Sequence, residues 1–577
     1  MSNVVVRIAG ANGDGIESSG SLLLKVAARS GMNVFGYRSY QSVIKGGHVW
    51  YQVRISDEEL YSHGDDVDIL VALNQDSITN QLRHVKENGI IIYDPDHVKV
   101  AADASKIKYI SIPLLSIATK IGGEPIMRNT AAIGAVLKII GVDFSVAEKL
   151  IDEMFGKKNP QIAEQNKSAA LEGYSYKGVE KLFDIKKDGA KRYVLDGNTA
   201  LSIGAYAAGC KFYAAYPMTP ASGIMHWFAA HENLGVLFKQ TEDEITAINA
   251  TIGAASAGVR AMCGTSGGGF SLMVEALGMA GMIEVPIVVV EAERSGPSTG
   301  LPTKTEQGDL LFVMHASQGE FPRIVVAPRS TEESFRVATE AFNLAERYQC
   351  PVLILSDLYM AEHIEGVKNF DYENIIIDRG RIVEKQEHEG RFDRYKLTDD
   401  GISPRSIPGT PGLEFVASTD EHDEYGNLIS DVFAGIDEYV EKRKKMHEKR
   451  MQKIWTMLKN EDIFKPYVEG EGAEYYLVTF GSATLPAREA VRELKEQGLN
   501  FGLISFSYLL PMDGEKVFNM LKGKKLIDVE YNYTAQLAQH IKTNSGISIE
   551  KMILKYDGEA FTPREIADKA KELAKGW

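Results

Sequence analysis

Cysteine is scarce in this sequence of 577 residues. The three present, Cys210, Cys263 and Cys350, lie far apart and form no CxxC pair. Iron–sulfur clusters and structural zinc sites need about four suitably spaced ligands, so this chain alone supplies neither. No apolar run approaches the ~20 residues that span a bilayer, and no export signal precedes the strand-like residues 4–8. We expect a cytoplasmic protein, in which any cluster belongs to a partner.

Positive charge is also in deficit. The 79 acidic side chains outnumber the 64 basic ones, which gives a formal net charge of -15. This balance disfavours nucleic acid as a partner and gives no reason to expect binding to a membrane surface. A hydrophobic fraction of 44% is that of an ordinary globular protein, and the chain is longer than one core normally supports. Several domains are therefore expected.

Strand, glycine-rich loop and helix patterns alternate along most of the chain, which predicts a multidomain α/β fold. A first α/β domain is expected over residues 1–185. A second covers 190–435 and ends in a charged excursion rich in proline and glycine. Residues 436–465 have the pattern of a charged connector helix, and 470–577 that of a final α/β domain.

Two segments of the second domain place polar residues beside expected elements, one after a short strand and one at the start of a helix. Residues 216–220 read Tyr-Pro-Met-Thr-Pro, which fixes the backbone around Thr219, although an ordinary turn with a capping threonine has the same pattern. Residues 242–244 read Glu-Asp-Glu and precede a helix rich in small residues. These acids either stabilise the helix N-terminus or include a carboxylate buried beside a cofactor.

Two further segments follow in the same domain. Residues 264–270 read Gly-Thr-Ser-Gly-Gly-Gly-Phe, which is either a tight turn or a loop that brings backbone amides to a ligand. Arg294 lies in the segment Glu-Arg-Ser-Gly-Pro-Ser-Thr-Gly, just after a buried strand. It can clamp a carboxylate through two hydrogen bonds or form a surface ion pair.

Taken in this order, the four segments resemble the pyrimidine-binding domain of 2-oxoacid:ferredoxin oxidoreductases. The resemblance covers nearly the whole chain. Residues 1–185 are similar to the family's gamma domain, and residues 401–405, 421–426 and 530–537 are similar to later segments of its alpha subunit. The implied fold is a gamma-type α/β domain, a thiamin-diphosphate-binding domain of pyrimidine type and a transketolase C-terminal-like domain.

The resemblance implies roles for individual residues. A glutamate that bonds the aminopyrimidine N1′ matches Glu244, because Gly253 follows nine positions later as in the family; Glu242 is the alternative. Thr219 and Arg294 would contact the substrate and its carboxylate. The residues that would contact the cofactor are Tyr216, Pro217, Met218, Glu244, Thr265, Ser266 and Gly267.

The resemblance also implies what this chain lacks. Thiamin enzymes hold magnesium with Gly-Asp-Gly and an asparagine about 25 to 30 residues later, but Asn33 lies too near residues 13–15. No metal ligand is therefore assigned here. Magnesium, the diphosphate site and a [4Fe-4S] cluster would come from a beta subunit, with an α2β2 assembly, ferredoxin as electron acceptor and coenzyme A as cosubstrate.

The glycine loop of residues 10–15 has two readings, a phosphate cradle for coenzyme A or a nucleotide, and a structural turn. The carboxylate of Asp14 would repel a bound anion. For the whole chain, CoA-dependent oxidation of 2-oxoglutarate to succinyl-CoA is the activity that the fused architecture favours, and the reverse reaction is also open. The alternatives are pyruvate or branched-chain 2-oxoacids, a non-redox thiamin enzyme, and a scaffold protein.

Overall fold

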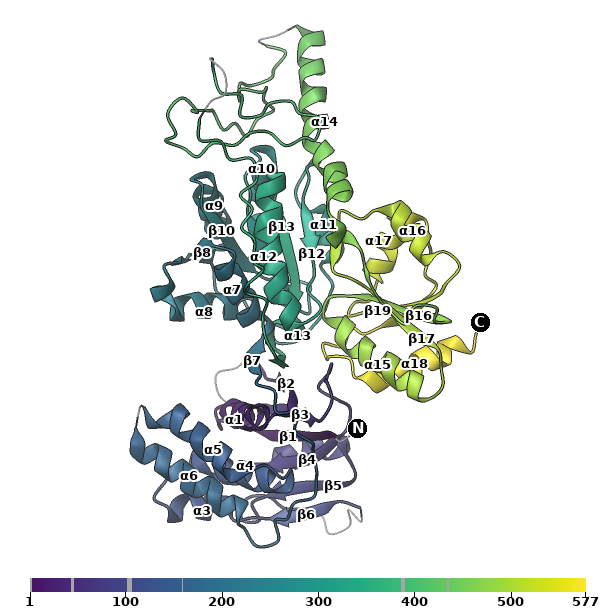
Figure 1. Ribbon diagram of the computed structural model, residues 1–577. Helices are drawn as coiled ribbons and strands as arrows, with labels where there is room; N and C mark the ends of the chain where they lie inside the picture. The colour runs from purple at the N-terminus through teal and green to yellow at the C-terminus, as the bar shows by residue number, and fades with distance from the viewer. Residues whose placement is uncertain (1–2, 43–45, 101–105, 158, 386–389, 433–434) are drawn as a thin grey trace. The chain divides into compact units, whose positions relative to one another are not determined.

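A computed structural model of the chain describes residues 3–42, 46–100, 106–157, 159–385, 390–432 and 435–577 (Figure 1). These residues form two compact units. Unit 1 contains residues 1–196, 362–370 and 562–564, and unit 2 contains the rest. The predicted multidomain α/β fold is confirmed. No helix of the described residues is both long and apolar enough to cross a bilayer.

Unit 1 is built on an eight-stranded mixed sheet in the order β6-β5-β4-β1-β3-β2-β14-β7. Its strands are β1 (Asn3–Ala11), β2 (Asn33–Ser39), β3 (His48–Ser56), β4 (Val67–Ala72), β5 (Val85–Tyr93), β6 (Lys108–Ser111), β7 (Tyr193–Asp196) and β14 (Ile364–Val367). Its helices are α1 (Ile16–Arg29), α2 (Gln75–Gln81), α3 (Leu114–Lys120), α4 (Arg128–Ile139), α5 (Phe144–Ile151) and α6 (Pro160–Tyr174).

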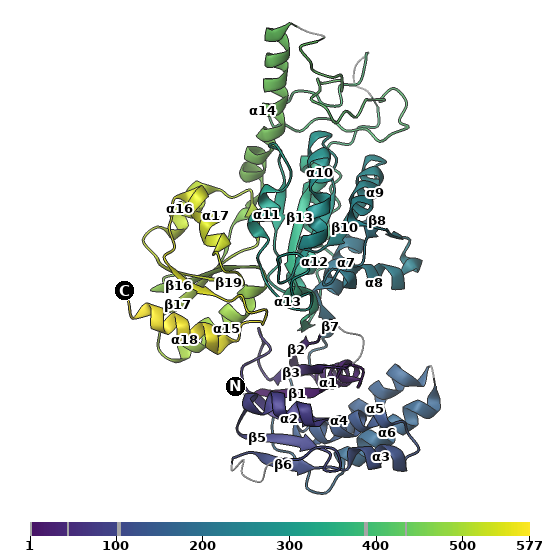
Figure 2. The same ribbon diagram turned by 180° about the vertical axis from the view of Figure 1, so that it is seen from behind.

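The alternation of apolar residues along β1 explains why both faces of this sheet are covered. Val4, Val6 and Ile8 face a core formed with α1 and α4, whereas Val5 and Ala9 face a smaller core that includes Ile78 of α2. Figure 2 shows α2 on the face of the sheet opposite to α4.

Unit 2 contains a seven-stranded sheet, β18-β12-β13-β11-β10-β8-β9, and a five-stranded sheet, β15-β17-β16-β19-β20. The strands of the larger sheet are β8 (Cys210–Ala215), β9 (Leu237–Gln240), β10 (Arg260–Thr265), β11 (Val288–Glu293), β12 (Ile324–Val326), β13 (Val352–Asp357) and β18 (Tyr508–Leu510). Those of the smaller sheet are β15 (Tyr467–Glu469), β16 (Tyr475–Phe480), β17 (Phe501–Phe506), β19 (Lys525–Glu530) and β20 (Lys551–Leu554). The larger sheet is parallel except for β18.

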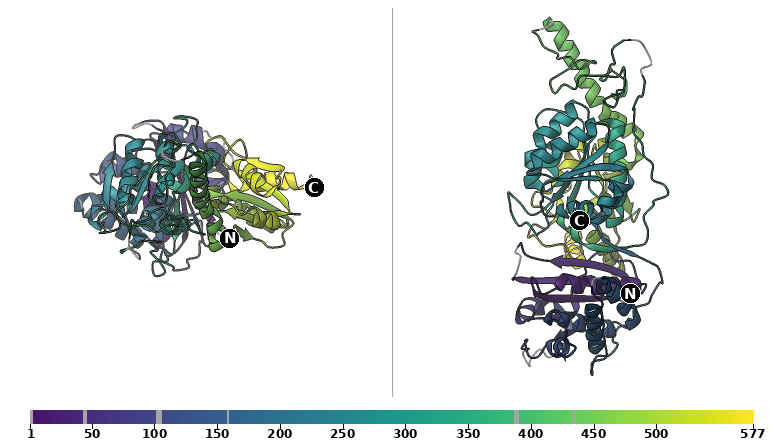
Figure 3. Two further views of the ribbon diagram at one scale, coloured as in Figure 1. Left: turned by 90° about the horizontal axis from the view of Figure 1, so that it is seen from above. Right: turned by 90° about the vertical axis from the view of Figure 1, so that its left-hand side faces the viewer.

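The helices of this part of the chain are α7 (Gly197–Ala207), α8 (Ser222–Ala230), α9 (Glu244–Ser256), α10 (Gly267–Met282), α11 (Leu310–His315), α12 (Thr331–Tyr348), α13 (Leu358–Glu362), α14 (Ile436–Asn460), α15 (Thr484–Glu496), α16 (Gly514–Leu521), α17 (Gln536–Ser545) and α18 (Pro563–Ala574). Strand β18 follows β17 in the chain yet pairs with β12, so the two sheets share a connection and pack side by side (Figure 3). This shared core explains why the two predicted α/β regions form one unit.

Candidate functional site

The candidate site lies at one edge of the larger sheet of unit 2. Strands β8, β10 and β11 are parallel neighbours, so the residues that follow them meet at their carboxyl ends. The same edge carries the N-termini of α9 and α10. The four segments singled out in the sequence therefore converge, because each follows one of four adjacent strands.

Glu244 begins α9 and is almost fully buried, with 3% of its surface exposed. The side chain of Asp243 caps the helix by accepting a hydrogen bond from the Thr246 amide at 2.7 Å. Cap and helix together fix the direction of the Glu244 side chain. Its Oε1 atom is buried and has no hydrogen-bond partner among the described residues.

The carboxylate of Glu244 lies against the start of α10. A Cβ atom on Gly269 would collide with Thr265 Oγ1 and with Glu244 Oε1, so only glycine fits there. Thr265 and Ser266 are fully buried, and Ser266 Oγ has no partner in the described part of the chain. Sequence reasoning selected Glu244, Thr265 and Ser266 but missed Gly269, although the glycine run contained the signal.

The three consecutive acids have three different environments. Asp243 is the helix cap, whereas Glu242 is exposed and accepts a hydrogen bond from Thr246 Oγ1 at 2.9 Å. Glu244 alone turns its carboxylate into the protein interior. Burial therefore favours Glu244 over Glu242 as the cofactor-binding residue.

Thr219 and Arg294 are in contact. The Arg294 Nη1 donates a hydrogen bond to the backbone carbonyl oxygen of Thr219 at 2.9 Å, and Arg294 Nε is buried without a partner in the described structure. Burial lowers the pKa of Arg294, although the nearby Glu291 opposes this shift. The loop before Thr219 leaves Tyr216 and Pro217 exposed. The arginine therefore has donors to offer to an anion beside this loop.

A buried acidic cluster that the sequence did not reveal lies next to Arg294. One oxygen from each of Glu291, Glu293 and Asp309 lies within 4.8 Å of the others. The Asp309 amide donates to Glu293 Oε1 at 2.7 Å, whereas neither oxygen of Glu291 has a partner in the described structure. Three carboxyl groups at this spacing either share protons or hold one hard cation.

The raised pKa values of these three carboxyl groups favour shared protons over a bound cation. Burial raises the pKa of Glu291 and Glu293 well above the usual range. Repulsion from nearby carboxylates adds to the shift, chiefly from Asp309 on Glu291 and from Glu291 on Glu293. Burial also raises the pKa of Asp309, to about 6. Protonated Glu291 carries no charge, so it leaves the positive charge of Arg294 uncompensated, whereas Asp309 keeps its proton only below about pH 6.

Gln307 connects this edge of the larger sheet to the smaller sheet. The side-chain amide of Gln307 donates to Asp357 Oδ2 at 3.1 Å. Its backbone carbonyl oxygen accepts a hydrogen bond from Asn532 Nδ2 at 3.0 Å. The backbone amide of Gln307 donates to the backbone carbonyl oxygen of Tyr531 at 2.7 Å. The segment 530–537 thus supports the loop that carries Asp309.

The glycine loop of unit 1 is braced from within its own unit. Asp14 Oδ2 accepts from the Ala11 amide and from Arg128, each at 3.3 Å. Asn129 donates to the Asp14 carbonyl oxygen at 2.5 Å. Asp14 is thus engaged in closing the loop, which the sequence left open between a phosphate cradle and a turn.

Comparison with protein families gives three matches that together cover most of the chain. Residues 5–176 match the family described as pyruvate ferredoxin/flavodoxin oxidoreductase. Residues 203–442 match the pyruvate flavodoxin/ferredoxin oxidoreductase domain described as thiamine-diphosphate-binding, and 473–566 match pyruvate:ferredoxin oxidoreductase core domain II.

Individual proteins match over nearly the full length. The 2-oxoacid:ferredoxin oxidoreductase subunit alpha of Sulfolobus sp is 33% identical, with 97% of this chain and 95% of that protein covered. The 2-oxoglutarate oxidoreductase subunit KorA of Mycobacterium tuberculosis is 30% identical, with 98% and 91% covered.

A solved structure is also similar to this chain over nearly its full length. The 2-oxoglutarate:ferredoxin oxidoreductase from Magnetococcus marinus, with 2-oxoglutarate, coenzyme A and succinyl-CoA bound, is 31% identical. It aligns with a TM-score of 0.91 over 99% of both chains.

Proposed function

Because this chain belongs to the 2-oxoacid:ferredoxin oxidoreductase family, as a homologue of its alpha subunits, we propose that it forms the pyrimidine and substrate half of a thiamin-dependent active site. The family resemblance inferred from the sequence is confirmed. The observation that carries the proposal is the buried carboxylate of Glu244, whose Oε1 atom has no partner in the described structure. A buried acceptor of this kind calls for a ligand that satisfies it.

The residues around Glu244 fit an aminopyrimidine. Glu244 would hold a proton at N1′, and Thr265, Ser266 and Gly267 would line the adjoining wall. Ser266 Oγ is a second buried polar atom without a partner in the described residues. Tyr216, Pro217 and Met218 would contact the cofactor from the loop after β8. Thiamin diphosphate, when bound, supplies the carbanion chemistry that attacks 2-oxoacids.

Arg294 and Thr219 would bind and orient the 2-oxoacid. The guanidinium is positioned by the Thr219 carbonyl oxygen, which leaves other donors for a substrate carboxylate. Protonation of Glu291 beside Arg294 supports this role, because an ionised Glu291 would compete with the substrate for the same positive charge.

We infer 2-oxoglutarate as the substrate, oxidised with coenzyme A to succinyl-CoA and carbon dioxide, with electrons passed to ferredoxin. Support comes from the 2-oxoglutarate relatives and from the ligands named for the Magnetococcus marinus enzyme. A beta subunit would complete the site with magnesium, the diphosphate-binding residues and a [4Fe-4S] cluster in an α2β2 assembly. The three scattered cysteines of this chain support a partner-borne cluster.

The test is to copurify the tagged chain from its host and to measure reduction of a viologen dye with 2-oxoglutarate or with pyruvate, each with and without coenzyme A. We expect a brown heteromer that needs coenzyme A and prefers 2-oxoglutarate. A preference for pyruvate would overturn the assignment of 2-oxoglutarate as the substrate. A colourless preparation with no activity on either acid would overturn the catalytic role.

A further inference from the structure

A cavity lies at the edge of unit 2 opposite to the candidate site. It has a volume of about 330 Å³ and lies between the C-terminal ends of α9 and α10 and the excursion that follows β14. Its apolar lining includes Ile283, Val285, Leu413 and Phe415, and its polar lining includes Arg394 and Arg405. Small-molecule sites have this size and this mostly apolar character.

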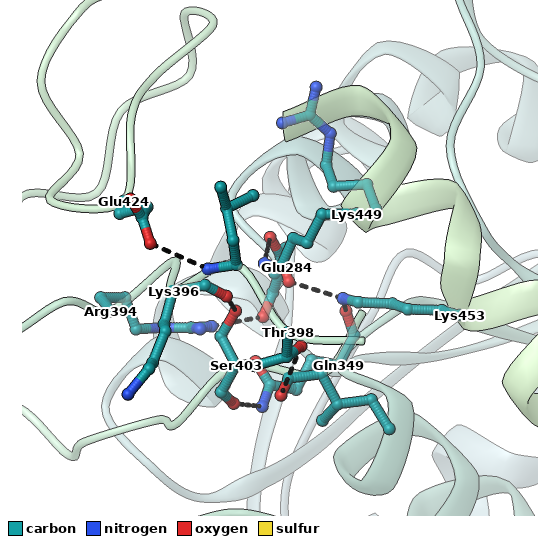
Figure 4. A network of polar contacts seen from close by, with 12 residues as sticks. Glu284, Gln349, Arg394, Lys396, Thr398, Ser403, Glu424, Lys449 and Lys453 are labelled. Carbon is teal, nitrogen blue, oxygen red and sulfur yellow. Dashed lines mark hydrogen bonds and ion pairs between the residues drawn. The ribbon is translucent and has the colours of Figure 1, made fainter. Parts of the chain in front are cut away.

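Arg394 belongs to a buried network with excess positive charge. Glu284 is fully buried and accepts from Lys449 Nζ at 2.5 Å and from Lys453 Nζ at 2.6 Å. Arg394 donates to the Glu284 carbonyl oxygen at 2.9 Å. Figure 4 shows both lysines reaching Glu284 from α14, with Arg394 on the side of the excursion. Three buried basic side chains thus contact one glutamate, two at its carboxylate and one at its backbone carbonyl oxygen.

Arg405 belongs to a second network of the same kind. Glu346, also buried, forms ion pairs with Arg260 at 2.8 Å, Arg379 at 2.8 Å and Arg405 at 2.9 Å. Arg260 and Arg405 are themselves buried, whereas the Arg379 side chain is 37% exposed. This carboxylate is therefore also shared among several cations.

The two networks meet at the cavity. Counting only the buried side chains, Glu284 and Glu346 contact five basic residues, Lys449, Lys453, Arg394, Arg260 and Arg405. A buried charge without a compensating partner destabilises the fold, because it has lost its hydration. Burial lowers the pKa of Lys449 to about 7 despite its contact with Glu284, so near neutral pH this lysine is only partly charged, and the other four basic side chains still outnumber the two carboxylates. Glu414, at the exposed rim, is the acidic residue of the cavity lining.

We propose that this cavity binds a small organic anion, with a carboxylate or phosphate group placed between Arg394 and Arg405 and an apolar body against Ile283, Val285 and Phe415. The anion supplies the negative charge that the two networks lack. Arginine forks suit both head groups, and the apolar walls select against a bare inorganic ion.

The cavity is separate from the catalytic edge but connected to it by two helices. Glu244 and Gly267 begin α9 and α10, whereas Ser256 and Ile283 stand at their far ends, on the cavity. Helix α9 has 13 residues, which corresponds to about 20 Å. An anion in the cavity therefore binds without touching the proposed substrate residues.

Phenyl phosphate, phenol and inorganic phosphate are the probes, titrated calorimetrically into the copurified protein. Phenyl phosphate should bind saturably and at least about tenfold more tightly than either of the others, because it alone combines the charge with the apolar body. Equal binding of phenol would overturn the anion site, and equal binding of inorganic phosphate would overturn the apolar subsite.

Two variants of neighbouring residues locate the binding. Ala417 lies on the cavity rim and takes part in neither network, so Ala417→Trp should block the cavity and weaken phenyl phosphate binding at least tenfold. Val416 is 53% exposed and does not line the cavity, so Val416→Trp is the matched control and should bind normally. Unchanged binding by Ala417→Trp, or no binding by the unmodified protein, refutes the proposal.

Discussion

Glu244→Gln is the substitution that tests the active site most directly. Glutamine keeps the size of the side chain but cannot hold a proton at the pyrimidine as a carboxylate does. Glu244 makes no ion pair in the described structure, and its Oε1 has no partner there, so the free energy of unfolding should change by less than about 1 kcal/mol. Turnover should fall about 10²- to 10⁴-fold, which corresponds to about 3–5 kcal/mol in the barrier.

The assay is 2-oxoacid-dependent dye reduction by the copurified complex, with thermal unfolding measured on the same preparations. Glu242→Gln is the matched control, because Glu242 is exposed and accepts a hydrogen bond from Thr246. It should retain near-normal turnover. Turnover by Glu244→Gln close to that of the unmodified protein, or an equal loss in Glu242→Gln, would refute the assignment.

Three other substitutions test the surroundings of this site. Arg294→Ala removes a charged hydrogen-bond donor worth about 1.5–3 kcal/mol, so kcat/KM for 2-oxoglutarate should fall roughly 10- to 100-fold, and an unchanged value would move the carboxylate clamp elsewhere. Gly269→Ala would push a methyl group against Thr265 and Glu244, so melting temperature and turnover should both fall, and normal values for both would contradict the close approach. Burial raises the pKa of Asp309 to about 6, so its protonated form contributes about 3 kcal/mol to the free energy of unfolding below about pH 4, and this contribution is lost as the pH rises through 6. Asp309→Asn should remove this loss when unfolding is measured as a function of pH. An unaltered pH profile would argue against a shared proton.

The sequence predicted the position of the site better than its chemistry. Thr219 and Arg294 follow the apolar strands β8 and β11, whereas Glu244 follows the short, largely exposed strand β9. Parallel neighbours bring all three residues to one edge. Burial was harder to predict. Glu242 and Glu244 lie two positions apart, on either side of the residue that caps α9. Which of them turns inward depends on how α9 is rotated about its axis relative to α10.

The acidic cluster shows why part of the site could not be predicted. Glu291 and Glu293 lie on the same face of β11 as the buried Val289, but every residue of β11 is buried, so alternation along the strand does not single them out. Asp309 joins them through a loop whose path depends on Gln307 and the smaller sheet. No local pattern encodes that path. The pairing of β14 with β2 in unit 1 could not be predicted from local patterns either, because the two strands are far apart in the chain.

Net charge was equally uninformative about the anion cavity. The chain carries -15 overall, and this excess of acidic groups argued against nucleic acid as a partner. The interior around Arg394 and Arg405 nevertheless has the opposite balance, because in the described structure the buried carboxylates of Glu284 and Glu346 are shared among five buried basic side chains. Exposed charges are screened by water and salt, whereas buried charges must be balanced by a neighbour or a ligand. The sign of a ligand is therefore set by the buried residues near its cavity, even in a protein whose total charge has the same sign as that ligand.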